Sequence, residues 1–254
     1  MTAVTKQGGA AALTAVLGDH TKHYASLLPK GYEPSRLITS ALVAISQTPE
    51  LMKCEHRSIA LALAKVAQWG LDVGDTAYLI PFKGKAVAVV GFKGLIQLMV
   101  GSAVRKVEAH VVREGEPFEY QRGTGEFLRH SPRSYERGKE PPITHAYAIV
   151  TLKFGYQQFE VMSAAEIEDI RQRFSVQWKS GPLPAWYARK TLIRRVAKYV
   201  PQSDRLKSAL ETDAEFAEEP EVPETSYTVD TETGEVMDTD APSAVVDGDE
   251  EYPL

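Results

Sequence analysis

The sequence predicts an α+β fold in which helices flank a mostly antiparallel sheet. Residues 34–69 carry apolar side chains at helical spacing, residues 78–161 largely alternate between apolar and polar, and residues 163–210 return to helical spacing. Helices, then strands, then helices again is the order typical of an α+β domain, whereas alternating strands and helices would predict a parallel sheet.

Composition places the chain among ordinary globular proteins. Its 254 residues are 43% hydrophobic and 25% charged, which excludes a collagen, a mucin and a fully disordered chain. No stretch approaches the roughly 18 consecutive apolar residues of a membrane span, and no basic segment followed by an apolar core opens the sequence. The single cysteine, Cys54, cannot form an intrachain disulfide. We therefore expect a cytoplasmic protein without membrane attachment.

Two helices are predicted before residue 70. They follow an Ala- and Gly-rich segment, 1–33, which we expect to be flexible or weakly helical. The first helix begins at Pro34, and its apolar face is formed by Leu37, Ala41, Ala44 and Ile45. The second covers 56–69 and repeats apolar residues at i, i+4 and i+7, namely Ile59, Leu63 and Val66. Gly70 is a typical helix stop.

A hairpin, a short helix and a strand come next. The alternating segments 78–82 and 86–90 flank Lys83-Gly84-Lys85, a loop of the kind that joins antiparallel strands. The sequence Gly-Phe-Lys-Gly over 91–94 leads into a short apolar helix over 95–100. Residues 107–111 alternate again and predict a half-buried strand.

The segment 113–142 precedes a last strand pair, 143–154 and 156–161, which turns at Gly155. Its glycines and prolines predict a long mobile loop or a hairpin extension. Its basic and titratable side chains are Arg113, Arg122, Arg129, His130, Arg133, Arg137 and Lys139.

Helices return in the last part of the predicted core, 34–213. Ser163-Ala-Ala-Glu166 matches the capping-box pattern and predicts a helix to about residue 174. A longer helix is expected from Pro184 to about Val200, before Pro201, and a short one over 203–210. Residues 214–254 have almost no large apolar side chains until their end and predict a disordered acidic tail.

Charge divides the chain at the start of this tail. Residues 214–254 contain 14 Asp and Glu and no Lys or Arg. The overall net charge of −5 therefore conceals a body, residues 1–213, with 29 basic and 20 acidic residues and a net charge of +9. A basic body of this kind favours a polyanionic partner.

The sequence lacks the signatures of common catalytic and cofactor sites. It has no P-loop, no Gly-x-Gly-x-x-Gly after a strand, no His-Glu-x-x-His and no cysteine pair. His20 and His23 are three residues apart but have no third ligand near them. Asp72 and Asp75 are suitably spaced for acid–base catalysis, yet a turn bracketed by glycines is where structural Asp residues collect. We therefore expect a protein that is not an enzyme and needs no metal or cofactor.

The strongest binding signal is the predicted helix over 185–199. Lys190, Arg194 and Lys198 form a row at i, i+4 and i+8, with Thr191 and Arg195 beside it. Because like charges at this spacing repel one another, a bound anion is a natural compensation. A row that rises about 6 Å per turn suits successive phosphates. The alternative is a basic face neutralised by acidic residues from elsewhere in the chain.

The second signal is the predicted hairpin with the Gly-Phe-Lys-Gly segment that follows it. This region combines three lysines with three aromatic residues: Lys83, Lys85, Lys93, Tyr78, Phe82 and Phe92. Stacking aromatics and cations together suit single-stranded nucleic acid. Gly91 and Gly94 would let backbone N–H groups approach a phosphate at a helix start. The alternative is a core hairpin with ordinary lysines in its turn.

Several of these motifs together resemble the RecT family of phage single-strand annealing proteins. The central block runs from Gly70-Leu-Asp through Tyr78-Leu-Ile-Pro-Phe82 to Val90-Gly-Phe-Lys-Gly-Leu-Ile-Gln-Leu98. The closing block contains Lys190-Thr191, Arg194-Arg195 and Lys198-Tyr-Val-Pro201. The resemblance extends over about 35–213 in order and with compatible spacing.

The resemblance implies an ATP-independent recombinase that coats single-stranded DNA and anneals it to a complementary strand. It implies a core, 34–213, for DNA binding and oligomerisation, with a fold related to the Rad-type annealing proteins and Red beta. The implied partners are single-stranded DNA, the annealed duplex intermediate, further copies in a ring or helical filament, a phage exonuclease and the host single-strand-binding protein. The DNA-binding residues expected from motifs and resemblance are Lys190, Thr191, Arg194, Arg195, Lys198, Lys93, Lys85, Lys83, Phe92, Tyr78 and Gln97.

Two other functions stay open from the sequence. One is a module that protects single strands without annealing them, since composition does not separate the two activities, and the other is an enzyme with an unrecognised site in 113–142. A separate question concerns the end of the tail, Asp249-Glu-Glu-Tyr-Pro-Leu254, which resembles the acidic tip of bacterial single-strand-binding proteins. That tip either occupies the basic body before DNA arrives or binds surfaces that recognise such tips, and the simpler reading is a solubilising tail.

Overall fold

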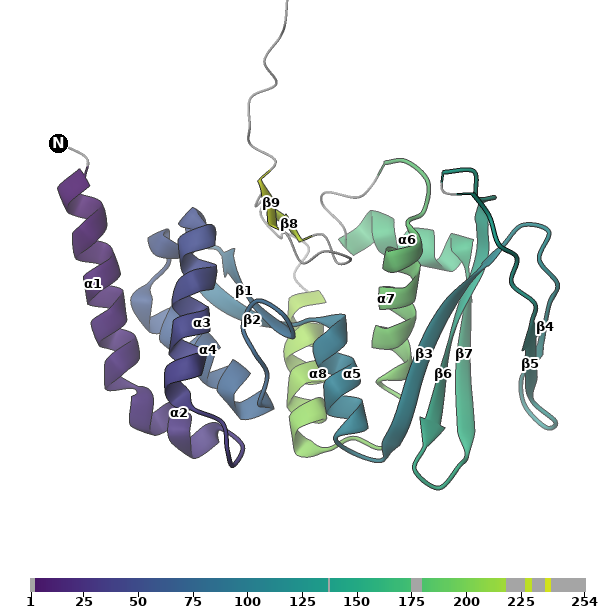
Figure 1. The fold of residues 1–254 in the computed structure, drawn as a ribbon, viewed down its shortest axis with the longest axis horizontal. Coiled ribbons are helices and arrows are strands. Elements are labelled where there is room, and N and C mark those ends of the chain that lie inside the picture. Colours follow the sequence, from purple (N-terminus) through teal and green to yellow (C-terminus); the bar gives the residue numbers. More distant parts are fainter. Residues whose placement is uncertain (1–2, 137, 175–179, 218–226, 230–235, 239–254) are drawn as a thin grey trace, which may run out of the picture. The chain divides into compact units, whose positions relative to one another are not determined.

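The structure is a computed structural model of the chain and describes residues 3–136, 138–174, 180–217, 227–229 and 236–238. The chain divides into two units, residues 1–224 and residues 225–254. The α+β class predicted from the sequence is confirmed, and the strand pairs of the described residues are antiparallel (Figure 1). Within the described residues, no helix is long and apolar enough to cross a membrane.

The N-terminal part of the first unit is helical. Its elements are α1 (Ala3–Asp19), α2 (Thr21–Leu27), α3 (Pro34–Gln47), the 3-10 helix η1 (Pro49–Lys53) and α4 (His56–Trp69). The segment that we expected to be flexible or weakly helical therefore forms two helices, with Leu13, Leu17 and Tyr24 buried. Alanine favours helix formation, but an Ala- and Gly-rich segment shows little periodic contrast in its sequence.

Helix α4 has the predicted bounds and contacts α1, α2 and α3. Gly70 ends it in the left-handed conformation, with φ of 71°, and its N–H bonds the carbonyls of Val66 and Ala67. A Cβ on Gly70 would lie 2.6 Å from Cγ of Pro29. Glycine is therefore required here both by backbone conformation and by the close approach of Pro29.

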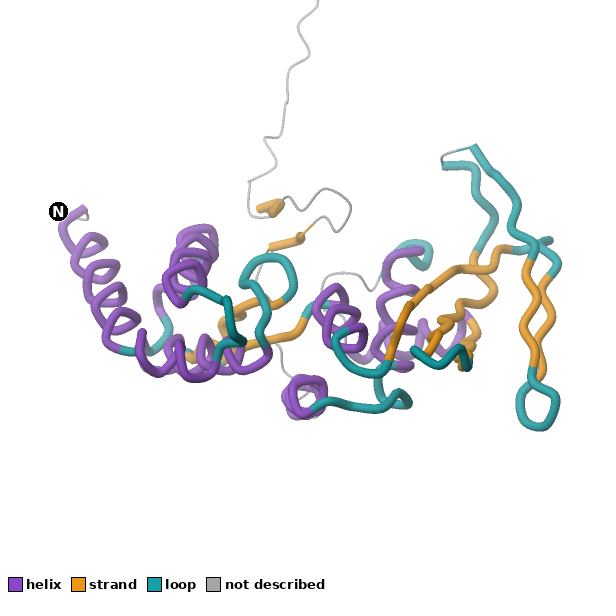
Figure 2. Tube along the Cα trace, turned by 60° about the horizontal axis from the view of Figure 1, so that its bottom comes forward, coloured by secondary structure: helices purple, strands orange, loops and turns teal. Residues whose placement is uncertain are grey.

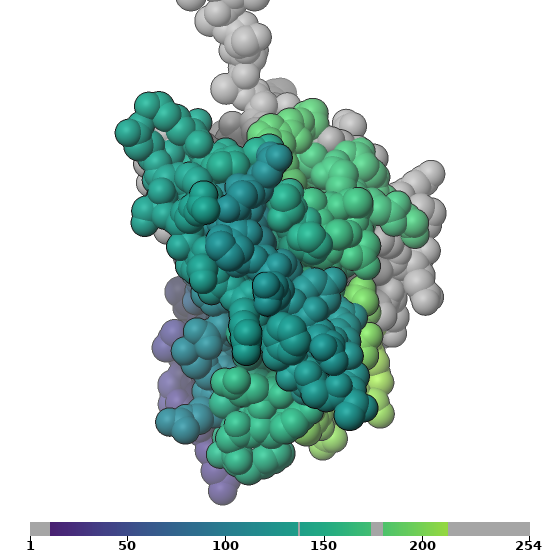
Figure 3. Space-filling view, turned by 90° about the vertical axis from the view of Figure 1, so that its right-hand side faces the viewer, coloured from purple at the N-terminus to yellow at the C-terminus, as the bar shows by residue number. Residues whose placement is uncertain are grey.

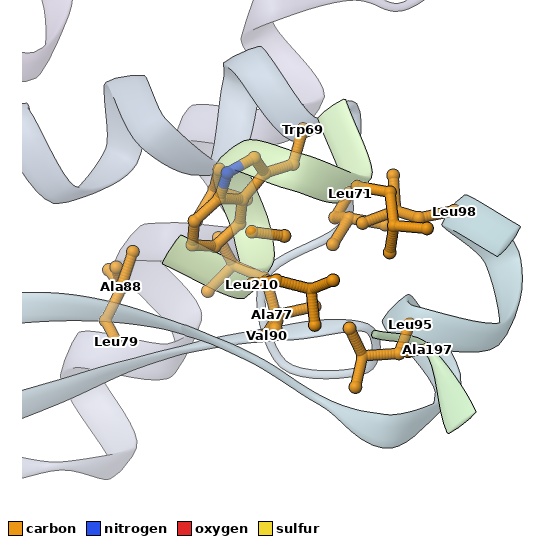
Figure 4. Packing of buried hydrophobic residues seen from close by; sticks show 14 of the residues in the cluster. Trp69, Leu71, Ala77, Leu79, Ala88, Val90, Leu95, Leu98, Ala197 and Leu210 are labelled. Atoms are coloured by element: carbon orange, nitrogen blue, oxygen red, sulfur yellow. The ribbon is translucent and has the colours of Figure 1, made fainter. Parts of the chain in front are cut away.

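The predicted first hairpin is present as β1 (Ala77–Phe82) and β2 (Lys85–Val90). Phe82 pairs with Lys85, so Lys83 and Gly84 alone form the turn, with φ of 46° and 76°. Positive φ at both central residues is characteristic of the type I′ turn, whose twist matches that of the strands. Figure 4 shows residues from this hairpin, including Leu79, Ala88 and Val90, in the core that also holds Trp69 and Leu210.

Helix α5 (Phe92–Val100) connects this hairpin to a separate three-stranded sheet. The strands β3 (Val104–Arg113), β6 (Ile143–Leu152) and β7 (Gln157–Ser163) are arranged in the order β3-β6-β7. Of the two readings of 113–142, the structure supports the hairpin extension, because β4 (Phe118–Gln121) pairs with β5 (Phe127–His130). The strands thus form separate small sheets, as the tube in Figure 2 also shows.

The last helices of the unit are α6 (Ala164–Phe174), α7 (Ala185–Val196) and α8 (Asp204–Ala217). The capping box at the start of α6 is confirmed: the Ser163 N–H donates to the Glu166 carboxylate at 2.8 Å, and the Glu166 N–H donates to the Ser163 hydroxyl at 3.2 Å. Helix α7 is shorter than predicted, and α8 extends past residue 213, where we placed the end of the core.

The two faces of the three-stranded sheet are covered by different elements. Helix α7 contacts β3, β6 and β7 on the face that carries Ala146 and Ala148. The β4–β5 hairpin packs on the alternate face, where the Phe118 ring lies 5.8 Å from the Tyr147 ring at an interplanar angle of 13°. Figure 3 views the unit from the end that carries this sheet and hairpin.

Only part of the predicted acidic tail lies within the described residues. Residues 214–217 belong to α8, and in the second unit β8 (Tyr227–Val229) pairs with β9 (Val236–Asp238). The remainder, 218–226, 230–235 and 239–254, lies outside the described residues, and so does the tip Asp249–Leu254.

Candidate nucleic-acid interface

The start of α5 is built by two glycines that pack closely against the loop before β1. A Cβ on Gly94 would lie 2.2 Å from the carbonyl oxygen of Thr76, and one on Gly91 would lie 2.8 Å from the Tyr78 ring. The Gly91 N–H donates to the Thr76 carbonyl at 2.9 Å. The Gly91 N–H therefore already has a partner within the chain, while the approach of a phosphate to the N–H groups at this helix start stays a prediction. These glycines permit close packing at the hairpin base.

Lys93 and Gln97 lie one helical turn apart on the exposed side of α5. The Lys93 ammonium lies 2.9 Å from a carboxylate oxygen of Asp75, and this hydrogen bond raises the pKa of Lys93. Both side chains are largely exposed, so the pair contributes at most about 1 kcal/mol to stability. Lys93 thus stays charged at neutral pH and accessible to a phosphate.

The two aromatic side chains at this end of the hairpin are less accessible than the predicted base stacking requires. Tyr78 is half-buried, its hydroxyl donates to the Asp75 carbonyl at 3.0 Å, and burial raises its pKa. Phe92 is half-buried and packs against the main core. Base stacking on either ring would require part of this packing to open.

The turn of the first hairpin carries two exposed lysines, Lys83 and Lys85. The Lys83 ammonium lies 4.9 Å from the centre of the Phe82 ring, within cation–π distance. With Gly84 between them, these lysines form what we call the hairpin tip. The strands behind it have six residues each, so the tip lies about 20 Å from the hairpin base.

The predicted cationic row of α7 does not form one solvated face. Thr191 is buried, and its hydroxyl donates to the Tyr187 carbonyl at 2.9 Å, so it lies on the packed side of the helix. The Arg195 guanidinium pairs with Glu160 of β7 at 3.2 Å, and Arg122 reaches the same carboxylate at 3.4 Å. The reason is tertiary, because α7 packs against α5 and all three strands of the larger sheet.

Arg194 connects the two regions that the sequence analysis identified, the basic helix and the hairpin with its Gly-Phe-Lys-Gly segment. Its guanidinium donates to the Val90 carbonyl at 3.0 Å, where β2 ends and the Gly-Phe-Lys-Gly segment begins. Lys190 lies over the Trp186 ring at 6.0 Å, and Lys198 is exposed just beyond the end of α7.

Two acidic partners of the predicted cations were not assigned to the site from the sequence. Asp75 was weighed only as an acid–base candidate, whereas it pairs with Lys93. Glu160, 35 residues before Arg195 in the chain, pairs with Arg195, and Arg122 pairs with the same carboxylate. No local pattern indicates such contacts. Among the side chains that the structure describes, no group of three potential metal ligands is found.

Exposed lysines at both ends of one hairpin of an α+β fold form a surface that suits a polyanionic ligand. Comparison with known proteins identifies the family. The profile of the RecT family matches residues 35–226. Protein RecT of Escherichia coli (strain K12) is 35% identical over 204 residues, which cover 74% of this chain and 74% of that protein. The chain belongs to the RecT family, as its motifs predicted.

Proposed function

We propose that this protein binds single-stranded DNA and anneals complementary strands without ATP, metal or covalent chemistry. Membership of the RecT family supports a role in DNA recombination by annealing. The structural observation that carries the proposal is the placement of exposed lysines at the tip and at the base of one hairpin. In this proposal the protein is not an enzyme and is located in the cytoplasm of a bacterial host.

In this proposal the hairpin spans a short length of one strand. The roughly 20 Å between tip and base is long enough to contact several successive phosphates of one strand. Lys83 and Lys85 neutralise phosphates at one end, and Lys93 does so at the other. Such contacts carry no sequence information, so the bases stay available to search for a complementary strand. Base pairing then supplies the free energy of annealing.

In this proposal Arg194 and Arg195 stabilise the fold and do not form one row of phosphate contacts. Arg194 holds the junction of β2 and α5 in place, because its donor reaches the Val90 carbonyl. Arg195 is already paired with Glu160. The remaining parts of the reading rest on the family: assembly into rings or filaments, a phage exonuclease, the host single-strand-binding protein, and residues 34–213 as the binding and oligomerisation core.

The decisive experiment uses two complementary fluorophore-labelled oligonucleotides, without ATP or metal. We expect annealing well above the spontaneous rate, and binding that weakens with salt. Tight binding of single strands with no acceleration would instead identify the alternative, a module that protects single strands. Absence of binding at low salt would overturn both readings.

A further inference from the structure

One end of the three-stranded sheet exposes two aromatic rings that the proposed function does not use. Phe154, in the turn between β6 and β7, is 76% exposed, and Tyr199, just beyond α7, is 54% exposed. Both lie on ordered backbone, because the Gly155 N–H donates to the Leu152 carbonyl at 2.9 Å and the Tyr199 N–H donates to the Val196 carbonyl at 3.0 Å. Turns are usually polar, so two ordered and exposed rings point to a ligand at this end of the sheet.

Two hydrogen bonds bring the three backbone segments at this end together. The Lys153 N–H donates to the Ala103 carbonyl at 2.9 Å, just before β3 begins. The Ser102 hydroxyl donates to the Pro201 carbonyl at 3.2 Å, just after α7 ends. Figure 1 shows the β6–β7 turn and the start of β3 at the same, lower end of the sheet. The two exposed rings therefore share one end of the sheet although they are far apart in the chain.

The charge of this end suits an anionic ligand. Four Lys and Arg and no Asp or Glu occur in its three segments, 102–106, 151–157 and 197–203. Lys106 pairs with Glu108 at 2.8 Å. Arg105, Lys153 and Lys198 are exposed and form no ion pair within the part of the chain that the structure describes. Three cations are thus available to a ligand beside the two rings.

Exposed rings among available cations are the combination that binds unpaired nucleotides. The rings stack on bases and the cations neutralise phosphates, whereas the bases of a duplex already stack on one another. Tyr156 is also exposed, but its hydroxyl donates to the Glu126 carboxylate at 3.2 Å, and that charge would repel a phosphate. We therefore leave Tyr156 out of what we call the sheet-end surface, which consists of Arg105, Lys153, Phe154, Lys198 and Tyr199.

The sheet-end surface and the first hairpin present DNA with opposite features. At the hairpin the lysines are exposed while the rings of Tyr78 and Phe92 are half-buried, so phosphates are bound and bases stay free to pair. At the sheet end the rings themselves are exposed, so bases are bound. Helix α5 has nine residues, which places the sheet end about 14 Å from Lys93. One stretch of strand cannot keep its bases free and also stack them on the protein.

We propose that the sheet-end surface captures the incoming, still unpaired strand while the hairpin holds the first strand. This inference rests on the proposed function, because only an annealing reaction brings a second strand to the protein. Stacking tolerates every sequence, since each base has a flat face, so any incoming strand is captured before it is tested for pairing. Capture raises the local concentration of the second strand beside the first, and the search for complementary bases becomes partly intramolecular.

The test measures the initial annealing rate of the intact protein, loaded with a fluorophore-labelled first strand, against the concentration of the complementary strand. The rate should level off, because the capturing surface fills. A thymidine oligonucleotide that pairs with neither strand should inhibit by competition, and a duplex should not. In the double variant Phe154→Ala, Tyr199→Ala, annealing at low second-strand concentration should be at least about ten-fold slower, and the inhibition should be lost.

Fluorescence anisotropy of the labelled first strand completes the measurement. Its affinity should be the same in the double variant and in the unchanged protein, and the thymidine oligonucleotide should not displace it. An unchanged annealing rate in the double variant would overturn the inference. Weaker binding of the first strand by that variant would overturn it too, since the rings would then contact the first strand. No annealing above the spontaneous rate by the unchanged protein would instead overturn the proposed function.

Two further double variants separate stacking from folding. Phe154→Tyr with Tyr199→Phe keeps both rings and should anneal at the original rate, whereas Phe154→Leu with Tyr199→Leu keeps apolar side chains without rings and should stay slow. The matched control Tyr120→Ala removes a ring that is 41% exposed on β4, and it should anneal as the unchanged protein does. Slow annealing by the ring-retaining variant or by Tyr120→Ala, or a full rate with the two leucines, would contradict the inference.

Discussion

Two hairpins of the first unit, β1–β2 and β4–β5, both carry several cations in the sequence but are stabilised by different interactions. The first, β1–β2 with the Gly-Phe-Lys-Gly segment, spans 78–94 and contains three lysines and no acidic residue. The second lies within 113–142, where six Arg and Lys are matched by six Glu. Counting cations alone would rank the second segment above the first. The matched acids make it neutral, and one of them, Glu116, is buried.

The bases of the two hairpins show this difference directly. At the first, glycines allow backbone to pack on backbone. At the second, the carboxylate of Glu116, only 3% exposed, accepts hydrogen bonds from the N–H groups of Arg113 at 2.6 Å and Arg133 at 2.9 Å. It also lies 3.1 Å from Nε2 of His130, whose Nδ1 lies 3.2 Å from the Tyr147 hydroxyl. Close packing leaves the lysines of the first hairpin exposed, whereas a buried polar network organises the second.

The largest expected effect comes from breaking the base of the first hairpin. In Gly94→Ala, the new Cβ would meet the Thr76 carbonyl, so we expect a loss of about 3 kcal/mol in the free energy of unfolding. Urea unfolding measures it. Gly18→Ala is the control, because nothing lies within 4 Å of its Cβ position and alanine favours a helix. Equal stability of the two variants would show that close packing does not hold this base.

A substitution at the base of the second hairpin should lower the free energy of unfolding by somewhat less than Gly94→Ala does. Burial alone would raise the pKa of Glu116, but hydrogen bonds from Arg133, Arg113 and His130 outweigh it and lower the pKa below 4.5. A lowered folded-state pKa stabilises the protein above the unfolded value, and this contribution is lost as pH falls through the folded-state pKa. Glu116→Gln should therefore lose about 1–3 kcal/mol at neutral pH and depend less on pH below about 4.5.

The control for this prediction is Glu119→Gln, since Glu119 is exposed on the outward face of β4. Thermal unfolding from pH 7 down to pH 3 gives both stability and its pH dependence. If the stability of Glu116→Gln falls between pH 7 and pH 3 as that of the unchanged protein does, Glu116 is not the group responsible for this pH dependence.

A smaller effect is expected at the hairpin tip. The double variant Lys83→Ala, Lys85→Ala should bind single-stranded DNA about ten-fold more weakly at low salt. The slope of log affinity against log salt should fall by about 1.4, because each lost phosphate contact on a single strand contributes about 0.7. The matched control removes Lys106 and Lys139, which pair with Glu108 and Glu136. A control as weak as the tip variant would mean that net charge, rather than position, determines binding.

The smallest effect is expected from the acidic tail. Removing 218–254 keeps the whole of α8 and takes away 13 acidic residues, which changes the net charge from −5 to +8. A tethered polyanion repels DNA, so the shortened protein should bind a few-fold more tightly at low salt and equally above about 0.15 M salt. Fluorescence anisotropy at the two salt concentrations measures this. Equal affinity at low salt would assign the tail a solubilising role.

The sequence by itself determined the elements whose signals are local. Helix α4 with its Gly70 stop, a hairpin that turns within Lys83-Gly84-Lys85 and the capping box at Ser163 depend on residues a few positions apart, so their patterns could be read directly. The pairing of Phe82 with Lys85, which leaves only two residues in that turn, came from the structure. The motifs over 35–213 likewise determined the family, because order and spacing are properties of the chain.

Only the tertiary structure decided which of the predicted DNA contacts remain accessible. Thr191 and Arg195 fit a basic helical face in the sequence, yet packing of α7 on the sheet buries the first and supplies Glu160 to the second. Arg194 is engaged by a carbonyl 104 residues earlier in the chain. Periodicity indicates which residues share a face of a helix. It carries no information about what packs against that face, because those contacts join residues far apart in the chain.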